Sequence, residues 1–336
     1  MLRRQPERAA LRARLGEFDR LVLLGDTLEL RHGPVRDALA AAAPVLSEMS
    51  AALSGGCEVV IVPGNHDHAL LRGWLERRDP TPLGLESPVD WDRREPLGAL
   101  VESLAPAGRG RVRVAYPGVW LREDVYATHG HYGDRHNTVP ILERLGAGVT
   151  VRVAGEPEAG PARAEDYEAA LAPMYAWADS VAQGGGLQLG GGGSFQIAAW
   201  QALNGRRSIR GRAMAVGLVA AVAALNRAGI GPLRADVSGV ALRRGALAGF
   251  AEVVTRLRVP ASHVIFGHTH RAGPLPGDDR SEWRATGATR LINIGSWVYE
   301  AQFVGDDPAS SPYRPGFAAV VSDDGPPELV NLLDPA

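Results

Sequence analysis

Four short apolar segments, rich in β-branched residues, each stop at a glycine that has Asp, Asn or His beside it. They span residues 21–24, 59–62, 125–128 and 264–266, and their composition predicts buried β-strands. They lead into Gly25-Asp26, Gly64-Asn65-His66-Asp67, His129-Gly130-His131 and Gly267-His268-Thr269-His270. Because strand ends meet at one edge of an open α/β sheet, we expect these polar groups to converge.

Helical spacing of apolar positions predicts helices over residues 8–15, 34–53 and 68–78, between and after the first two strands. Residues 111–115 and 118–122, on either side of Tyr116-Pro117, are expected to form a hairpin that leads into the third strand. Further strands are predicted near the end of the chain, at 289–294, 297–304, 316–322 and 327–332.

Between these two strand-rich parts the pattern changes. Helices are predicted at 166–182, 196–203, 214–225 and 241–257, and the glycines at 184–186 and 190–193 indicate a flexible stretch among them. We therefore expect an α/β core made of residues 1–134 and 256–336, with a mostly helical insertion or cap over 135–255.

Composition excludes several classes of protein. The 336 residues are 45% hydrophobic and 22% charged, as in globular proteins, and the net charge of −2 predicts no bulk attraction to nucleic acid. Cys57 is the single cysteine, which favours a reducing, cytoplasmic location, and the first residues show no signal-peptide pattern. The most apolar stretch, 213–225, is shorter than the ~20 residues of a membrane span.

The polar groups at the strand ends suit a metal centre. His268 and His270 are two residues apart, so in an extended segment both rings can face one side. Asp26 alone could be a turn residue, but beside the other groups it is a candidate bridging carboxylate. Asn65 offers a neutral oxygen ligand. At the third strand end we favour His129 as the ligand.

Other polar residues have candidate roles around such a centre. His66 is a candidate proton donor, and Asp67 a partner that could fix its tautomer. His131 is expected either to contact substrate or to be packed. Arg135 could bind an anion, although a solvated loop is the alternative. His32 and His263 are expected not to be ligands, with His263 a hydrogen-bonded structural residue.

The four motifs, in this order and spacing, resemble those of the calcineurin-like metallophosphoesterases. Asn293-Ile294-Gly295-Ser296-Trp297 is similar to the segment that follows the Gly-His-x-His motif in that family. The resemblance covers about 20–134 and 260–335. It implies a four-layer α/β sandwich with two central mixed β-sheets flanked by helices.

The resemblance also implies a binuclear metal centre, of Mn²⁺, Fe or Zn²⁺, that hydrolyses phosphate mono- or diesters or pyrophosphates through a metal-activated hydroxide. Asp26 would bridge the ions, Asn65, His129 and His268 would complete one of them, and His270 would serve the other. His66 would protonate the leaving group or stabilise charge on the phosphoryl oxygens. The substrate would be a small or lipid-linked phosphate compound.

One family motif does not occur in this sequence. Members of the family carry Asp-x-His upstream of Gly-Asp, and no Asp-x-His precedes Asp26. Either the motif lies upstream of the residue at which this sequence starts, or the protein lacks it and binds only one ion. In the second case a weakly active or inactive metal-binding or interaction module is the alternative to an enzyme.

Overall fold

The computed structural model describes residues 5–54, 56–105, 111–140, 142–183, 209–236, 238–305 and 307–334, and divides them into two compact units. The first unit comprises residues 1–130 and 259–336, and the second comprises residues 131–258. The boundaries predicted from the sequence, 134/135 and 255/256, lie within four residues of these.

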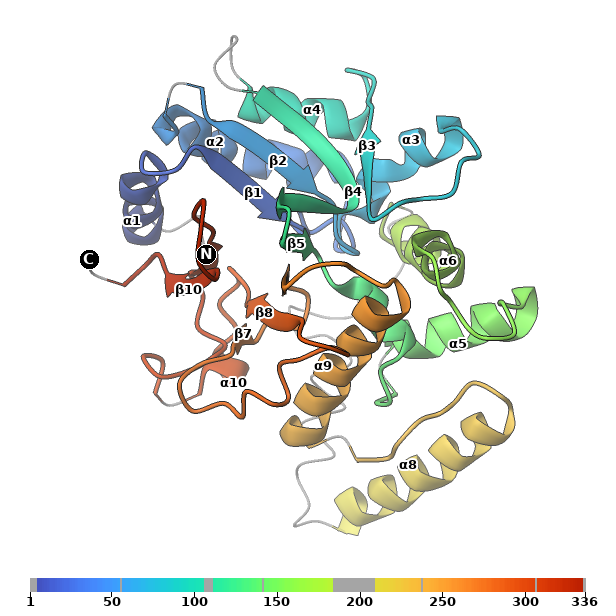
Figure 1. Cartoon of the computed structure of the whole chain (residues 1–336). Helices are drawn as coiled ribbons and strands as arrows, with labels where there is room; N and C mark the ends of the chain where they lie inside the picture. The colour runs from blue at the N-terminus through green and yellow to red at the C-terminus, as the bar shows by residue number, and fades with distance from the viewer. Residues whose placement is uncertain are drawn as a thin grey trace. The chain divides into compact units, whose positions relative to one another are not determined.

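The first unit is α/β, as expected, with a mixed sheet of eight strands (Figure 1). The strand order is β1-β2-β4-β5-β6-β8-β7, and β3 also pairs with β4. The strands are β1 (Arg20–Leu24), β2 (Glu58–Val62), β3 (Glu86–Val89), β4 (Arg111–Arg122), β5 (Val125–Thr128), β6 (His263–Phe266), β7 (Ala272–Gly273) and β8 (Arg290–Ile294). A second, two-stranded sheet pairs β9 (Phe317–Val320) with β10 (Glu328–Asn331).

Strand β4 belongs to both halves of the large sheet. Its first residues pair in parallel with β2, and from Gly118 onward it pairs antiparallel with β5. The predicted hairpin at Tyr116-Pro117 is therefore wrong, because β4 runs through this point and the reversal follows Arg122. Pro117 fits there because it lies between the last residue paired with β2, Val114, and the first paired with β5.

One hydrophobic core joins the two halves of the sheet. Leu24 and Val60 come from β1 and β2, whereas Ala127, Ile265 and Ile292 come from β5, β6 and β8, yet all belong to one buried cluster. Side chains of the small sheet, such as Leu329, pack against the same cluster. The sheet is therefore curled, and its two halves bury a common apolar interior, as expected of an α/β sandwich.

Helices cover the first unit: α1 (Gln5–Leu15), α2 (Val35–Ala52), α3 (Arg72–Arg77), α4 (Pro96–Leu104) and α10 (Ala301–Val304), together with the 3₁₀ helix η1 (His68–Leu71). Helix α2 packs against α1 and α4. The helices predicted at 8–15, 34–53 and 68–78 are confirmed, and α4 and β3 were not predicted. The strand predicted at 297–304 is wrong, because the last four residues of that segment form α10.

The second unit contains η3 (His131–Arg135), α5 (Leu142–Ala154), α6 (Ala164–Gln183), α8 (Ile209–Arg227) and α9 (Gly239–Arg256), and no strand among its described residues. Helix η3 packs against α5, α6 and α9. The rings of Tyr132 and Tyr167 stack with centroids 5.1 Å apart, which fixes η3 on α6. The helix predicted at 196–203 and the glycine stretch lie outside the described residues. No described helix combines the length and the apolar composition that crossing a bilayer requires.

Candidate metal centre

The candidate metal ligands form a group where parallel strands of the first unit end. Strands β1 and β2 are parallel, with Leu24 opposite Val62, so the loops that follow them leave the sheet side by side. Strands β5 and β6 are also parallel, and His129 and Gly267 come directly after them. The sequence thus brings Asp26, Asn65, His129 and His268 together from four different strand ends.

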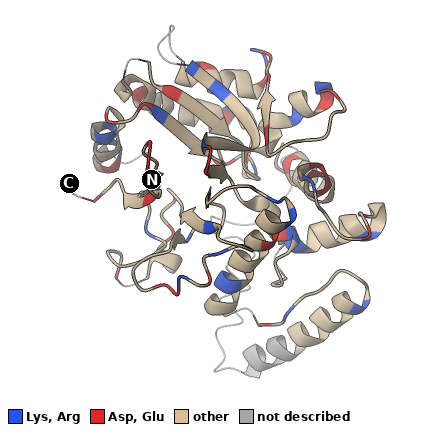
Figure 2. Cartoon of the chain, viewed as in Figure 1, with Lys and Arg blue, Asp and Glu red and all other residues tan. Residues whose placement is uncertain are grey.

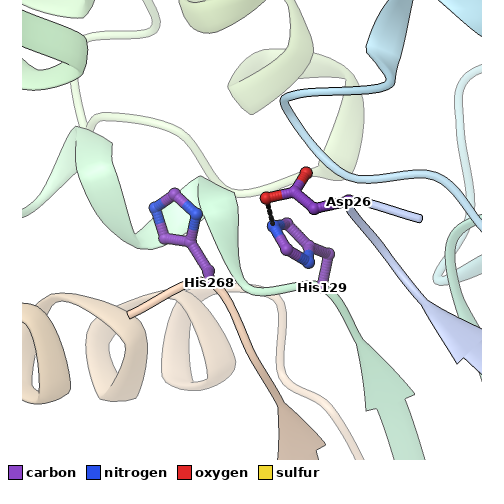
Figure 3. Close-up of side chains that lie close together, drawn as sticks. All are labelled: Asp26, His129 and His268. Carbon is purple, nitrogen blue, oxygen red and sulfur yellow. Dashed lines mark ion pairs between the residues drawn. The ribbon is translucent and has the colours of Figure 1, made fainter. Parts of the chain in front are cut away.

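Asp26, His129 and His268 could hold a metal ion, because each offers one ligand atom and these atoms lie within 4.8 Å of one another (Figure 3). His129 Nε2 is 3.1 Å from Asp26 Oδ2. The amide oxygen of Asn65 is 3.1 Å from His129 Nε2 and 3.2 Å from His268 Nδ1. The predicted ligands Asp26, Asn65, His129 and His268 are therefore all present in one cluster.

The tautomer of His129 is set by the backbone. Its Nδ1 is 3.1 Å from the carbonyl oxygen of Leu24, so Nδ1–H donates to that oxygen and Nε2 is the nitrogen that faces the group. Nε2 lies 3.1 Å from Asp26 Oδ2 and 3.1 Å from Asn65 Oδ1. A divalent cation could take the place of a proton on Nε2 and be coordinated by all of these atoms.

The orientation of the Asn65 side chain supports the same conclusion. Asn65 is 2% exposed, and its Nδ2 has no hydrogen-bond partner among the described residues. Its oxygen points into the group, toward Nε2 of His129 and Nδ1 of His268, which is the orientation a metal ligand needs.

Two glycines allow the ligands to approach so closely. A Cβ on Gly64 would collide with Asp26 Oδ1 and would lie 2.7 Å from His129 Cδ2. A Cβ on Gly25 would overlap the His129 ring. Asp26 and His268 themselves adopt left-handed conformations, with φ of 50° and 66°. Strain of this kind is common at functional sites, where surrounding contacts maintain it.

Electrostatics keep Asp26 ionised. Burial opposes ionisation, but the neighbouring His129 outweighs it, with smaller contributions from His66 and His268, so the pKa of Asp26 lies well below its usual value. Asp26 also accepts a hydrogen bond from the backbone amide of His66 at 2.8 Å. The carboxylate is therefore charged and fixed in position, as a metal ligand should be.

Asp67 does not have the predicted role. It is fully buried, and its carboxylate accepts hydrogen bonds from the amides of Gly64 at 2.6 Å and Thr27 at 2.8 Å. It thereby joins the β1 and β2 loops. Burial and the charge of Asp26 raise the pKa of Asp67 to about 6. Because its oxygens face these amides, it does not set the tautomer of His66.

Glu29 is the partner of His66, with Oε2 2.6 Å from Nδ1. Burial alone would lower the pKa of His66, but the hydrogen bond that its Nδ1–H donates to Glu29 and the charge of Asp26 raise it. Sequence reasoning missed Glu29, although its position three residues after Asp26 was a signal: the turn after β1 returns the chain to the β2 loop.

A second residue that sequence reasoning left without a role is Asn293, at the end of β8. Its Nδ2 donates to the Gly267 carbonyl at 2.9 Å and to Thr269 Oγ1 at 2.8 Å, and its Oδ1 accepts from the Gly295 amide at 2.8 Å. Asn293 is 1% exposed. It therefore supports the loop that carries His268.

His270 is not a member of the group. Its Nδ1 lies 3.2 Å from Glu300 Oε2, and its backbone is also left-handed, with φ of 61°. The left-handed residues 268 and 270 break the extended geometry that the two-residue spacing assumed. Within the described ranges there is one group of three ligand side chains. The prediction that His270 binds a second ion is not supported by this arrangement.

The remaining predicted residues lie in the second unit or inside a strand. His131 is buried against Tyr132 and Tyr175, which agrees with the packed alternative. Arg135 pairs with Glu156 and is largely buried, so the solvated-loop alternative is wrong. Contact of either residue with substrate remains a prediction. His263 is buried in β6, but neither ring nitrogen has a hydrogen-bond partner in the described part of the chain, contrary to expectation.

Comparison with protein-family models, with curated proteins and with solved structures found no match to this chain. The geometry of the group and the order of its motifs are therefore the basis for any statement about function.

Proposed function

We propose that the protein is a metal-dependent phosphoesterase, a hydrolase that cleaves phosphate mono- or diesters or pyrophosphates through a metal-activated hydroxide. The observation that carries the proposal is the convergence of Asp26, Asn65, His129 and His268, with the His129 tautomer fixed by the Leu24 carbonyl. Mn²⁺, Fe or Zn²⁺ suits this mixture of oxygen and imidazole ligands.

In this proposal the metal ligands and the proton donor are different residues of the chain. Asp26, Asn65, His129 and His268 would hold one divalent ion. A second ion of the binuclear centre would need ligands other than His270, which pairs with Glu300. A bound divalent cation lowers the pKa of water and neutralises charge on phosphoryl oxygens. His66 holds a proton, because Glu29 raises its pKa, and gives it to the leaving oxygen.

The substrate class is a small or lipid-linked phosphate compound in the cytoplasm. Nucleic acid is disfavoured by the net charge of −2. A non-catalytic metal-binding module is the alternative, and the following experiment separates the two functions.

The experiment measures metal affinity and hydrolysis in the same samples. Metal-free protein is titrated with Mn²⁺ or Zn²⁺ by calorimetry, and hydrolysis of bis-p-nitrophenyl phosphate and p-nitrophenyl phosphate is followed with each metal. His129→Ala and His268→Ala are expected to lose metal affinity by more than about a hundredfold, since even outer-sphere changes cost ~10–100-fold. Hydrolysis should fall in parallel, and a chelator should abolish it reversibly.

His32→Ala is the matched control for metal affinity, because His32 is an exposed histidine outside the group; its Nδ1 lies 3.8 Å from Glu29 Oε2, so only the affinity is compared. It should bind the metal as tightly as the wild type. Tight metal binding without hydrolysis of any phosphate ester or anhydride would support the non-catalytic module instead. Equal metal affinity in the wild type and in His129→Ala would refute the metal centre altogether.

A further inference from the structure

From Gly217 to Leu225, helix α8 presents mostly small apolar side chains to solvent. Residues 213–225 contain no charged or polar side chain, and from Gly217 to Leu225 only Val222 is buried. Val219 is 58% exposed, and the alanines at 220, 221, 223 and 224 are exposed as well. A helix that is apolar all round is normally enclosed by protein or lipid.

The charged residues in the sequence around α8 are all basic. From residue 180 to 235 there is no Asp or Glu, whereas six arginines occur there: Arg206, Arg207, Arg210, Arg212, Arg227 and Arg234. In Figure 2 the described part of α8 carries no acidic residue, and basic residues lie at its C-terminal end and in the loop that follows. The overall net charge of −2 therefore conceals a local excess of six positive charges.

Apolar surface bracketed by arginines matches the chemistry of an anionic bilayer surface. Apolar side chains enter the headgroup and acyl boundary, while basic residues near the surface are attracted to anionic lipid. The helix is expected to lie in the interface and not to cross it, because no described helix satisfies the length and hydropathy of a span.

A second copy of this chain is a poorer fit. In a two-fold interface the same patch meets itself, so the arginines around one α8 would face those around the other. No acidic residue between 180 and 235 is available to pair with them. Charge complementarity therefore favours a lipid surface over self-association.

We infer that α8 docks the protein on the surface of anionic membranes, with the side of the helix that includes Val219 inserted among lipids and Arg227, at the end of the helix, on the headgroups. This surface is independent of the proposed catalytic centre. Membrane docking is a property of the helical unit and does not depend on the metal centre.

The test uses the full chain and vesicles of defined composition. Co-sedimentation is measured with vesicles of phosphatidylcholine alone and with vesicles that contain 30 mol% phosphatidylglycerol. We expect binding to the anionic vesicles only, weakening as NaCl is raised, and a partition coefficient lowered about fivefold or more in Val219→Asp. Metal binding by the group at Asp26 should be unchanged in this variant.

Val153→Asp is the matched control, because Val153 is an 82% exposed valine on α5 in the same unit. It introduces the same charge and should leave vesicle binding unchanged. Equal loss in both variants would assign the effect to net charge and overturn the role of α8. Equal binding to neutral and anionic vesicles, or binding to neither, would overturn the proposal. The proposal would also be overturned if the protein bound no vesicles and light scattering showed a dimer that Val219→Asp dissociates.

Discussion

The Nδ1 atom of His66 lies 2.6 Å from Oε2 of Glu29, so a carboxylate from the β1 loop orients an imidazole from the β2 loop. Neither residue belongs to the ligand group itself. Replacing Glu29 by Gln keeps the shape but removes the charge that holds the proton on His66. We expect kcat for a phosphate ester to fall about ten- to a hundredfold, with metal affinity unchanged. Steady-state kinetics beside calorimetry measures both, and a parallel loss of metal affinity would contradict this separation of roles.

Gly64 marks the place where the β2 loop passes the ligands. In Gly64→Ala the added Cβ would meet Asp26 Oδ1 and the His129 ring, so the loop must shift and the ligand atoms separate. We expect metal affinity to fall by at least about tenfold and thermal stability to fall with it, by about 1–3 kcal/mol. Gly277→Ala is the control, since a Cβ there meets nothing within 4 Å. Equal effects of the two substitutions would show that close packing at Gly64 is not what positions the group.

Asn293 donates to Gly267 and Thr269 on either side of His268 and accepts from the Gly295 amide, and the bonds to Gly267 and Gly295 are buried. Asn293→Ala leaves the Gly267 carbonyl and the Gly295 amide without this partner, at a cost of about 1–3 kcal/mol for each buried group left unsatisfied. We expect a lower midpoint of urea unfolding and weaker metal binding. Thr269→Val removes only one of the three contacts and should have the smaller effect. If Thr269→Val were the more damaging variant, the central role of Asn293 would be wrong.

His136 makes the stability of the helical unit depend on pH. Burial, together with the charges of Arg135, Arg256 and Arg144, lowers its pKa to about 3, and its Nε2 accepts a hydrogen bond from the Tyr167 hydroxyl at 2.8 Å. The unfolded chain, with an ordinary histidine pKa of about 6.5, binds a proton that the folded chain does not. The contribution of His136 is therefore complete above about pH 6.5 and is lost as pH falls toward 3, by up to about 1.4 kcal/mol per pH unit.

Thermal unfolding between pH 7 and pH 5 tests this linkage. The wild type should lose more stability over that interval than His136→Asn, in which the titrating group is absent. His32→Asn, which removes an exposed histidine, should follow the wild type. Identical pH dependence in the wild type and in His136→Asn would show that His136 titrates in the same way in the folded and unfolded chains.

The apolar segments and their terminal ligands could be predicted because both signals are local. Buried strands such as β2 and β6 appear as short β-branched runs, and Asp26, Asn65, His129 and His268 follow them directly. Partners that depend on how a loop turns could not be predicted in the same way. Asp67 and Glu29 lie within a few residues of His66 and Asp26, and only the folded path of the two loops decides which carboxylate reaches which group.

Two further predictions were wrong because they used local sequence alone: the hairpin at Tyr116-Pro117 and the common face of His268 and His270. Tyr116-Pro117 has the composition of a turn, but β2, β3 and β5 all pair with β4 around it and keep it extended. His268 and His270 have the spacing of neighbours on one face of a strand, but the chain leaves β6 at Phe266 and both adopt left-handed backbone conformations. Local spacing gives correct side-chain directions only while the strand continues.

Strand β4 has a consequence for how the first unit opens. Because one strand pairs with β2 at its beginning and with β5 at its end, withdrawal of β4 from the sheet breaks both ladders at once. Amide protons of Val114 and Val119 should therefore exchange with solvent in a single concerted event. The two pairs of loops that carry the ligands would then be released together, which makes loss of the metal centre an all-or-none transition.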